Sequence, residues 1–230
     1  MPRAAVTYSF NTGPYTSHTQ LLAALPARGE GRAVLDVGCA DGYLGEILAG
    51  RGYRVTGIDL PRASRNGFPR SVRLVEADLD SGLPEFGERF DYIVCADVLE
   101  HLRDPAACLA ELRGALAEGG RIVASLPNSG HAWFRLNVLA GRFPQTDHGL
   151  FDRTHLRFYT WRGWRDLFAS AGFAFEALRC SGVPVRLTVP RFEGTLTVRF
   201  LEWLSFACAR FWKTLFAYQF VVTARREGAQ

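Results

Sequence analysis

The chain of 230 residues has a single lysine, Lys213, although it carries 27 basic residues and a net charge of +4. Its positive charge therefore comes from arginine, and the arginines are scattered along the chain without forming a basic stripe. Proteins that bind nucleic acids concentrate their cations on one face or along one helix. We therefore expect no nucleic-acid partner.

Three further features are missing. The five cysteines are odd in number and contain no C-x-x-C pair, which favours thiols in a reducing, cytoplasmic setting. The N-terminal residues lack the apolar stretch and small-residue cleavage site of a secretory signal. The most apolar region, 196–223, is interrupted by charged residues, so we expect no stable membrane insertion, while peripheral contact with a membrane stays open.

Apolar runs of strand length alternate with helical or loop segments through the first half of the chain. The runs are RAVLDVG (32–38), YRVTGIDL (53–60), SVRLVEAD (71–78), FDYIVCAD (90–97) and GRIVASLPN (120–128). This alternation predicts right-handed crossovers and a parallel sheet covered by helices on both faces. The runs FAFEALRC (173–180) and YQFVVTARR (218–226) predict a sixth and a seventh strand.

Turn and capping residues place the ends of several helices. The segment 16–25 reads as a helix in which Ser17 and Gln20 stand at capping-box spacing. A second helix starts at Pro105 and ends near Glu118, where a pair of glycines follows. A third is expected between Thr160, as its cap, and Gly172, as its stop.

A last helix is expected between Thr195 and Lys213. Its apolar residues recur at helical spacing: Leu196, Phe200, Trp203, Leu204, Ala207 and Phe211. We favour a helix that packs on the edge of the sheet. The alternatives are a surface that rests on a membrane, a site for a lipid-linked acceptor, or the interface of a dimer.

The stretch VLDVGCADG (34–42) connects the first strand to the next helix. A dinucleotide-binding turn needs glycine at three positions of G-x-G-x-x-G, but counted from Gly38 these hold Gly38, Ala40 and Tyr43. The pattern acidic-x-G-x-G-x-G fits better, with Asp36, Gly38, Ala40 and Gly42 and one departure. The turn favours a ligand without phosphate and disfavours an NAD-dependent oxidoreductase.

Four stretches in order, VLDVGCADG, GIDL, EADL and FDYIVCADVLEHLRDP, resemble the class I S-adenosylmethionine-dependent methyltransferases. The resemblance covers residues 30–180, roughly, and is specific because all four stretches fall at strand ends. It implies an α/β, Rossmann-like, seven-stranded and mostly parallel sheet with helices on both faces and an antiparallel last strand. It also implies S-adenosylmethionine as the cofactor and S-adenosylhomocysteine as the product.

We expect one methyltransferase domain over residues 1–230. An N-terminal helical cap would cover 1–30, the cofactor-binding core 31–127, an acceptor-site lid 128–160, and C-terminal helices and strands 161–230. The molecule would be a monomer or a homodimer.

Carboxylates at successive strand ends suit such a cofactor. Asp59, at the end of the second strand, can accept both ribose hydroxyls, and Asp78, after the third, can accept from the adenine amino group. Asp36 can offset the ammonium charge, while the backbone of Gly38 and Gly42 lets the methionine part lie close. The expected set is completed by Leu60, Leu79 and Asp97. The alternative for each carboxylate is a structural cap or an ordinary solvated side chain.

Methyl transfer to a hydroxyl needs a positioned acceptor and a group that removes its proton. We expect His155, in a segment that resembles the one closing the acceptor site in the family, to be the base, with His148 next. His101 reads as a structural residue, and His155 could instead hold the lid down. A metal site from His148, Asp152 and His155 lacks a recognised spacing, and transfer from a sulfonium needs no metal, so we expect none.

The acceptor is expected to be a small molecule. Family members that methylate amino groups of nucleic-acid bases carry an Asn/Asp-Pro-Pro-aromatic motif where this chain reads CADV (95–98). A hydroxyl of a sugar or natural product is our first interpretation. A lipid-linked or quinone-like acceptor at the membrane, and a non-catalytic protein that binds S-adenosylmethionine, are the alternatives.

Overall fold

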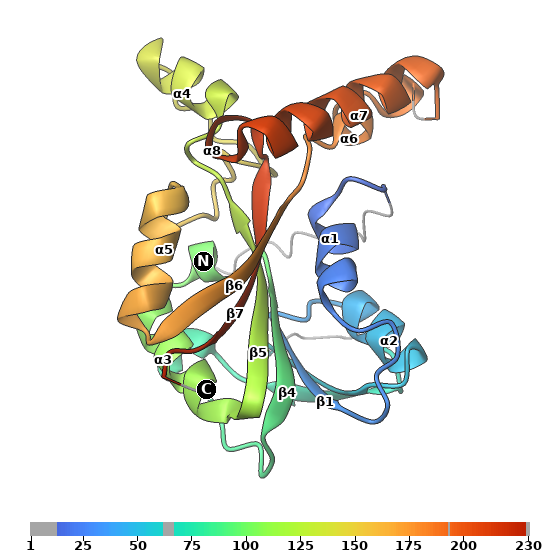
Figure 1. The fold of residues 1–230 in the computed structure, drawn as a ribbon, viewed down its shortest axis with the longest axis vertical. Helices are drawn as coiled ribbons and strands as arrows, with labels where there is room; N and C mark the ends of the chain where they lie inside the picture. The colour runs from blue at the N-terminus through green and yellow to red at the C-terminus, as the bar shows by residue number, and fades with distance from the viewer. Residues whose placement is uncertain (1–12, 62–66, 193, 229–230) are drawn as a thin grey trace.

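The computed structural model describes residues 13–61, 67–192 and 194–228, whose seven strands form one sheet (Figure 1). The order across the sheet is β3-β2-β1-β4-β5-β7-β6. The strands are β1 (Ala33–Val37), β2 (Arg54–Asp59), β3 (Val72–Glu76), β4 (Phe90–Ala96), β5 (Leu116–Pro127), β6 (Phe173–Cys180) and β7 (Gln219–Arg226).

Strand β7 runs antiparallel to both of its neighbours, and the pairings among β1 to β5 are parallel. The expected fold class and the antiparallel last strand are therefore confirmed. The last strand does not lie at the edge of the sheet, because it inserts between β5 and β6.

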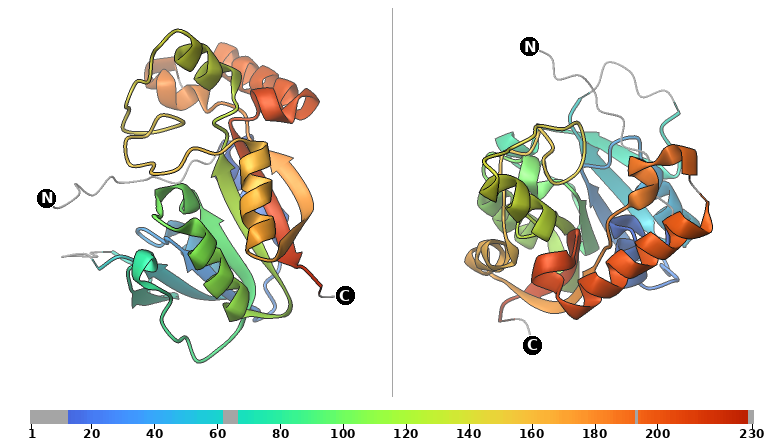
Figure 2. Two further views of the ribbon diagram at one scale, coloured as in Figure 1. Left: turned by 90° about the vertical axis from the view of Figure 1, so that its left-hand side faces the viewer. Right: turned by 90° about the horizontal axis from the view of Figure 1, so that it is seen from above.

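Helices cover both faces of the sheet. The helices α1 (Ser17–Ala24) and α2 (Tyr43–Gly50) lie on one face, and α3 (Pro105–Ala115) and α5 (Trp161–Ser170) lie on the other (Figure 1). Four helices lie together beyond the carboxyl ends of the parallel strands (Figures 1 and 2): α4 (Ala132–Leu139), α6 (Val185–Thr188), α7 (Leu196–Phe211) and α8 (Lys213–Phe216). Short 3-10 turns are η1 (Leu79–Ser81), η2 (Leu99–His101) and η3 (Pro190–Phe192).

Two apolar cores follow from the alternation of side chains along each strand. In β1, Leu35 and Val37 pack with α3 and α5, and Val34 packs with α1 and α2. Trp164 of α5 is fully buried in the first core, and its indole N–H donates to the carbonyl of Pro127 at 2.9 Å. That bond fixes the end of β5, where the chain leaves the sheet toward α4.

Two helix ends differ from the sequence-based expectation. Helix α1 is capped by Thr16, whose hydroxyl accepts from the backbone N–H of Thr19 at 3.4 Å, so the capping box of Ser17 and Gln20 was wrong. Helix α3 ends at Ala115, before Glu118, because Leu116 is already buried as the first residue of β5. The glycines that follow form an irregularity inside the strand: Phe90 pairs with Leu116, but Tyr92 pairs with Arg121.

Helix α7 does not bury the apolar stripe that the sequence predicts. Its buried side chains are Val198, Glu202 and Ala209. The predicted apolar stripe faces solvent, with Leu196 80% exposed and Phe211 91% exposed. The helix was correctly placed in the chain, and it contacts the edge strand β6 as we favoured, but through a face other than the apolar stripe. Among the described residues, no helix combines the length and the apolar character needed to cross a bilayer.

An ion pair attaches α7 to the rest of the protein. The carboxylate of Glu202 accepts hydrogen bonds from Arg186 of α6, at 2.8 Å from Nε and 2.5 Å from Nη2, and at 3.2 Å from the backbone N–H. The Glu202 side chain is only 5% exposed, and these bonds hold its pKa below the usual value. A buried carboxylate with this many donors is costly to leave unpaired.

We therefore expect Arg186→Ala to lower the free energy of unfolding by about 3 kcal/mol, because it leaves the buried carboxylate without its partner. Urea denaturation followed by circular dichroism measures the change. The control is Arg162→Ala, which removes an exposed pair with Asp166 on α5 and is expected to cost less than about 0.5 kcal/mol. Equal losses in the two variants would contradict the prediction.

Candidate active site

The turn between β1 and α2 has a left-handed backbone at three alternate positions. The φ angles are 69° at Gly38, 49° at Ala40 and 79° at Gly42. A Cβ at residue 38 would lie 2.0 Å from Cγ2 of Val98, and one at residue 42 would lie 2.8 Å from Phe68, so both positions require glycine. Ala40 keeps the same turn in spite of its methyl group.

The carboxylate of Asp59 joins this turn to the end of β2. One oxygen accepts from the backbone N–H of Ala40 at 2.6 Å, and the other accepts from the N–H of Leu60 at 2.7 Å. An ionised carboxylate has about four acceptor sites and is a group that can accept the hydroxyls of a ligand. Asp59 is half-buried, and Leu60 is 45% exposed beside it.

Asp36 is buried in β1, the strand next to the one that ends at Asp59. Burial and the nearby charge of Asp59 raise its pKa to about 7, although a hydrogen bond from the backbone of Gly45 opposes the shift. Its Oδ2 atom has no hydrogen-bond partner among the described residues. A buried carboxylate in this state fits a cationic ligand, which would return its pKa toward the ordinary range.

Asp78 follows β3 and is exposed. Its side chain caps η1 by accepting from the backbone N–H of Asp80 at 3.0 Å. At least one of its oxygens therefore has the role of a structural cap, which was the alternative to binding a cofactor. Leu79, next to it, packs against the larger core. The two residues lie at the carboxyl end of β3, which is adjacent to β2 in the sheet.

Asp97 follows β4 with a left-handed φ of 54°. Its Oδ1 atom accepts from the hydroxyl of Ser125 on β5 at 2.7 Å and from the amide of Gln219 on β7 at 2.6 Å. The backbone N–H of Asp97 donates to the same hydroxyl at 3.0 Å. The neighbouring strands β4, β5 and β7 therefore fix the position of this carboxylate.

A small cavity of about 70 Å³ lies beside Asp97, at the carboxyl ends of the strands. Its walls come from the turn after β4, the end of β5, the start of β7 and the segment 149–155. The lining includes Asp97, Glu100, His101, Pro127, Gly149, Leu150, Asp152, His155, Tyr218 and Gln219.

Glu100, His101 and His155 meet in this cavity. Nε2 of His155 lies 3.8 Å from Oε1 of Glu100, and the rings of the two histidines meet edge to face at 4.8 Å between centroids. One ligand atom from each of the three residues lies within 4.8 Å of the others. The absence of a metal stays a prediction, and this cluster is where the described residues could hold a divalent cation.

Burial favours the neutral forms of Glu100 and His155. It raises the pKa of Glu100 well above its usual range, with the charge of Asp97 adding to the effect. It lowers the pKa of His155 to about 4, with His101 adding to that shift. Oε2 of Glu100 has no hydrogen-bond partner among the described residues. A neutral imidazole has a free lone pair on one ring nitrogen and can accept a proton.

The lid is attached to the turn after β4. The carbonyl of Glu100 accepts from the backbone N–H of Leu156 and of Arg157, at 2.9 and 3.1 Å. Nδ1 of His101 lies 3.2 Å from the carbonyl of Thr154, which can only accept, so the ring carries its proton on Nδ1. His101 therefore has a structural contact with the lid, as we expected. The backbone bonds of Leu156 and Arg157 hold the neighbouring His155 where it lines the cavity.

His148 does not join the cluster. It is exposed in the lid loop, and it does not line the small cavity, as His155 does. The metal group considered from the sequence, with His148, Asp152 and His155, is therefore not the group that the structure brings together.

The sequence analysis missed three residues that line the cavity. Glu100 looked like one polar residue of an ordinary turn, and Tyr218 and Gln219 looked like the start of a strand. Burial raises the pKa of Tyr218 to about 12, and Gln219 holds Asp97. A glutamine inside the apolar run FAYQFVV was the only signal in the sequence.

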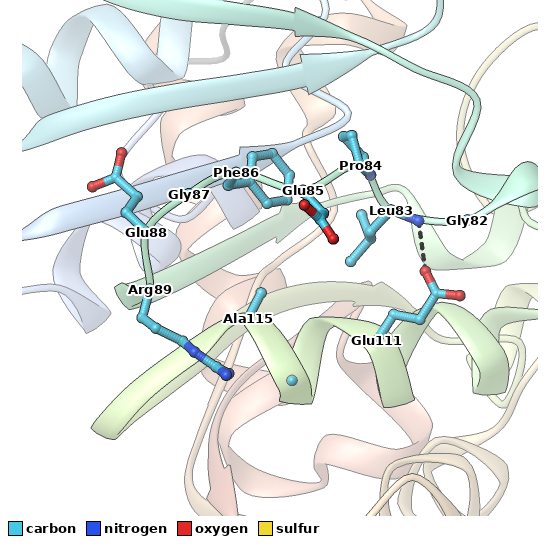
Figure 3. Close-up of a pocket in the computed structure, with 11 residues that line it drawn as sticks. Gly82, Leu83, Pro84, Glu85, Phe86, Gly87, Glu88, Arg89, Glu111 and Ala115 are labelled. Carbon is cyan, nitrogen blue, oxygen red and sulfur yellow. Dashed lines mark hydrogen bonds between the residues drawn. The ribbon is translucent and has the colours of Figure 1, made fainter.

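A larger hollow, about 590 Å³, lies at the opposite end of the sheet (Figure 3). It is formed by the loop before β4 and the end of α3, and Glu111 accepts from the backbone N–H of Leu83 at 2.6 Å beside it. Ligands of open α/β sheets bind at the carboxyl ends of the strands, so this hollow is not the candidate site.

A model of a family described as methyltransferase domain matches residues 14–178. The chain belongs to this family. The match confirms the expected class, a methyltransferase domain. The orphaned carboxylate of Asp36 and the glycine-rich turn without a phosphate pattern fit the cationic cofactor expected from the sequence, S-adenosylmethionine.

A curated relative is the ubiquinone biosynthesis O-methyltransferase of Proteus mirabilis, 31% identical over 118 residues, which are 47% of each chain. The chain spans about half the length of the curated relatives it matches. Among solved structures, an S-adenosylmethionine-dependent methyltransferase of Mesorhizobium loti has a TM-score of 0.60 at 20% identity, covering 92% of this chain and 98% of its own. The 1,6-didemethyltoxoflavin-N1-methyltransferase of Burkholderia thailandensis, with bound S-adenosylhomocysteine, has a TM-score of 0.57 at 19% identity, covering 92% and 76%. These two likenesses concern the fold.

Asp36 gives the site a pH dependence. Its ionisation is opposed by the folded protein, so this group costs stability as the pH rises from its usual pKa toward about 7. A ligand cation reverses that cost. We expect S-adenosylhomocysteine, which keeps the ammonium group, to bind more weakly as the pH falls below about 7, by up to roughly tenfold per pH unit.

Isothermal titration calorimetry across this pH range measures the effect. The Asp36→Asn variant is expected to bind S-adenosylhomocysteine weakly, with an affinity that does not change with pH. Glu85→Gln, in the hollow at the opposite end of the sheet, should keep the wild-type profile. An unchanged profile in Asp36→Asn would show that another group titrates.

Proposed function

We propose that the chain transfers a methyl group from S-adenosylmethionine to a hydroxyl of a phenolic or quinone-like acceptor that has an apolar part. The observation that carries the proposal is the position of His155: it lines a small cavity at the strand ends, next to Asp97 and beneath an aromatic lid. A base, a carboxylate row and an apolar wall are thus within one site.

On the cofactor side, we propose the roles implied by the resemblance. Asp59 accepts the ribose hydroxyls, and Asp36 offsets the ammonium charge. Asp78 accepts from the adenine amino group, with Leu60 and Leu79 beside the adenosine. The backbone of Gly38 and Gly42 lets the methionine part lie close. Asp97 lines the proposed acceptor cavity.

When bound, the cofactor supplies an activated methyl group on a sulfonium. On the acceptor side, the neutral imidazole of His155 takes the proton of the acceptor hydroxyl as the oxygen forms its bond to the methyl carbon and the carbon–sulfur bond breaks. The imidazolium is then stabilised by the carboxylates of Asp97 and Asp152, whose charges raise the pKa of His155. Oε1 of Glu100 lies 3.8 Å from Nε2 of His155.

The lid favours an apolar acceptor over a sugar. Four phenylalanines pack on one another above the cavity, with ring centroids 4.5 to 5.9 Å apart: Phe134, Phe143, Phe151 and Phe158. The name of the curated relatives, ubiquinone biosynthesis O-methyltransferase, supports the quinone-like alternative from the sequence. None of these phenylalanines lines the cavity itself, whose walls are mostly polar, so the preference for an acceptor with an apolar part rests on the lid beside the cavity.

The first test is cofactor binding. We expect S-adenosylmethionine and S-adenosylhomocysteine to bind in a calorimetric titration and NAD not to bind. Asp59→Ala should weaken the two adenosyl ligands by about 100-fold, because it removes the ribose acceptor and both backbone contacts. Asp59→Asn keeps one carbonyl acceptor, so its affinity for the adenosyl ligands is expected to lie between those of the wild type and Asp59→Ala. NAD binding, or full affinity in Asp59→Ala, would contradict the assignment.

The second test separates an enzyme from a non-catalytic binding protein. Formation of S-adenosylhomocysteine is measured with phenols and quinols, with and without a prenyl tail, and with sugars as the opposing set. We expect turnover with the tailed phenols or quinols. His155→Ala should lower kcat by about 10²–10⁴-fold without weakening S-adenosylhomocysteine.

His148→Ala is the matched control, because it removes the other lid histidine from an exposed position. It should keep the wild-type kcat. If both histidine variants keep full turnover, neither is the base. If kcat of His155→Ala falls only together with its melting temperature, His155 holds the lid and does not take the proton.

A further inference from the structure

Helix α7 exposes its apolar stripe. Phe200, Trp203 and Leu204 are 56%, 50% and 41% exposed, and Leu196 and Phe211 at the two ends are more exposed still. The side that faces the protein carries Val198, Glu202 and Ala209. An amphipathic helix of a globular protein normally buries its apolar stripe, so this helix is built for contact with something outside the chain.

The exposed apolar surface extends to the neighbouring helices. Apart from Leu60, every large apolar side chain that the structure describes as exposed lies within residues 133–212. We call the following set the apolar cap: Trp133, Leu136, Val138 and Leu139 of α4, Leu187 of α6, Phe192 of η3, Leu196, Phe200, Leu201, Trp203, Leu204 and Phe211 of α7, and Trp212. Figures 1 and 2 show these elements at one end of the molecule, beyond the strands.

Among the described residues, the exposed charges within the helices of the apolar cap are cations. Exposed cations follow or lie within its elements: Arg135, Arg142, Arg191, Arg199 and Arg210, with Lys213 half-buried. The acid within these helices is Glu202, which is buried and paired with Arg186. Glu193, between η3 and α7, lies outside the described residues. An apolar surface with tryptophans and a cationic border suits a lipid interface that is negatively charged.

The same surface fits a second copy of the chain poorly. A two-fold dimer would bring the same patch together from both molecules. Arg199 and Arg210 would then meet cations, and Glu202 is already paired. Like charges facing each other across an interface oppose association.

Helix α4 connects the apolar cap with the small cavity. Four of its side chains belong to the apolar cap, while its buried Phe134 packs with Leu150, Phe151 and Tyr218. Leu150 and Tyr218 also line the cavity that holds His155. The apolar cap and the cavity are therefore neighbours in the structure.

We infer that the apolar cap binds the surface of an anionic lipid bilayer, with α7 lying in the interface and its arginines on lipid headgroups. The inference does not require the proposed acceptor, because it rests on the exposed stripe of α7 and the charges around it. Binding is peripheral: the apolar side chains enter the headgroup boundary, and the sheet stays in water.

Vesicle co-sedimentation tests this inference. The full chain is mixed with vesicles of phosphatidylcholine alone, or of phosphatidylcholine with phosphatidylglycerol. We expect it to pellet with the anionic vesicles and to bind at least about tenfold more weakly to the neutral ones, or at high salt. Recovery of the protein in the supernatant with both kinds of vesicle would overturn the inference.

Two pairs of variants locate the contact. Phe200→Ser with Trp203→Ser should weaken binding to anionic vesicles by about tenfold or more, since both side chains would leave the boundary. Arg199→Gln with Arg210→Gln should weaken it by a similar factor. Arg162→Gln with Arg165→Gln, which removes two exposed charges from α5, is the matched control and should bind as the wild type does.

Titration with S-adenosylhomocysteine keeps this test separate from the proposed function. Variants of the apolar cap should bind that ligand with wild-type affinity, which shows that they are folded. Sedimentation equilibrium without lipid is the last measurement. If the Phe200→Ser/Trp203→Ser variant turns a dimer into a monomer while vesicle binding stays unchanged, a second copy covers the stripe and the inference is wrong.

Discussion

The carboxylate of Asp59 is the contact on which the rest of the cofactor side depends. It accepts from the backbone N–H of Ala40 and of Leu60, and so joins the turn after β1 to the end of β2. Ala40 has a left-handed backbone, which costs an alanine about 1–2 kcal/mol. The hydrogen bond to Asp59 offsets part of that cost. The same turn places Gly42, the N-cap residue of α2.

The two sides of the site differ in charge. On the expected cofactor side, carboxylates lie near the carboxyl ends of four neighbouring strands, and repulsion from Asp59 is part of what raises the pKa of Asp36. A cation relieves this repulsion, which a phosphate would increase. On the lid side, burial shifts the pKa of Glu100 and of His155 in opposite directions, and both shifts favour the neutral form. The first side fits a positive ligand, and the second keeps its buried acid and imidazole neutral.

The sequence was most informative where a structural feature depends on residues that are close together in the chain. Each strand is an apolar run, and Asp36, Asp59 and Asp97 each lie at or just after the end of one, so the fold and the carboxylate row could be predicted together. Gln219 was missed because its contact with Asp97 depends on β7 inserting between β5 and β6, which is a long-range pairing. The orientation of α7 was missed for a related reason: helical spacing shows that one face is apolar, but not that Glu202 and its partner anchor the opposite face.

The insertion of β7 gives the protein an order of assembly. Strand β6 is hydrogen-bonded in the sheet only through β7 among the described strands, and Asp97 receives its amide donor from the first residue of β7. Both contacts join segments far apart in the sequence, and such contacts form late in folding. During synthesis, the ribosome must release residues 219–226 before the sheet can close, so a nascent chain can complete its first four strands while its acceptor cavity still lacks a wall.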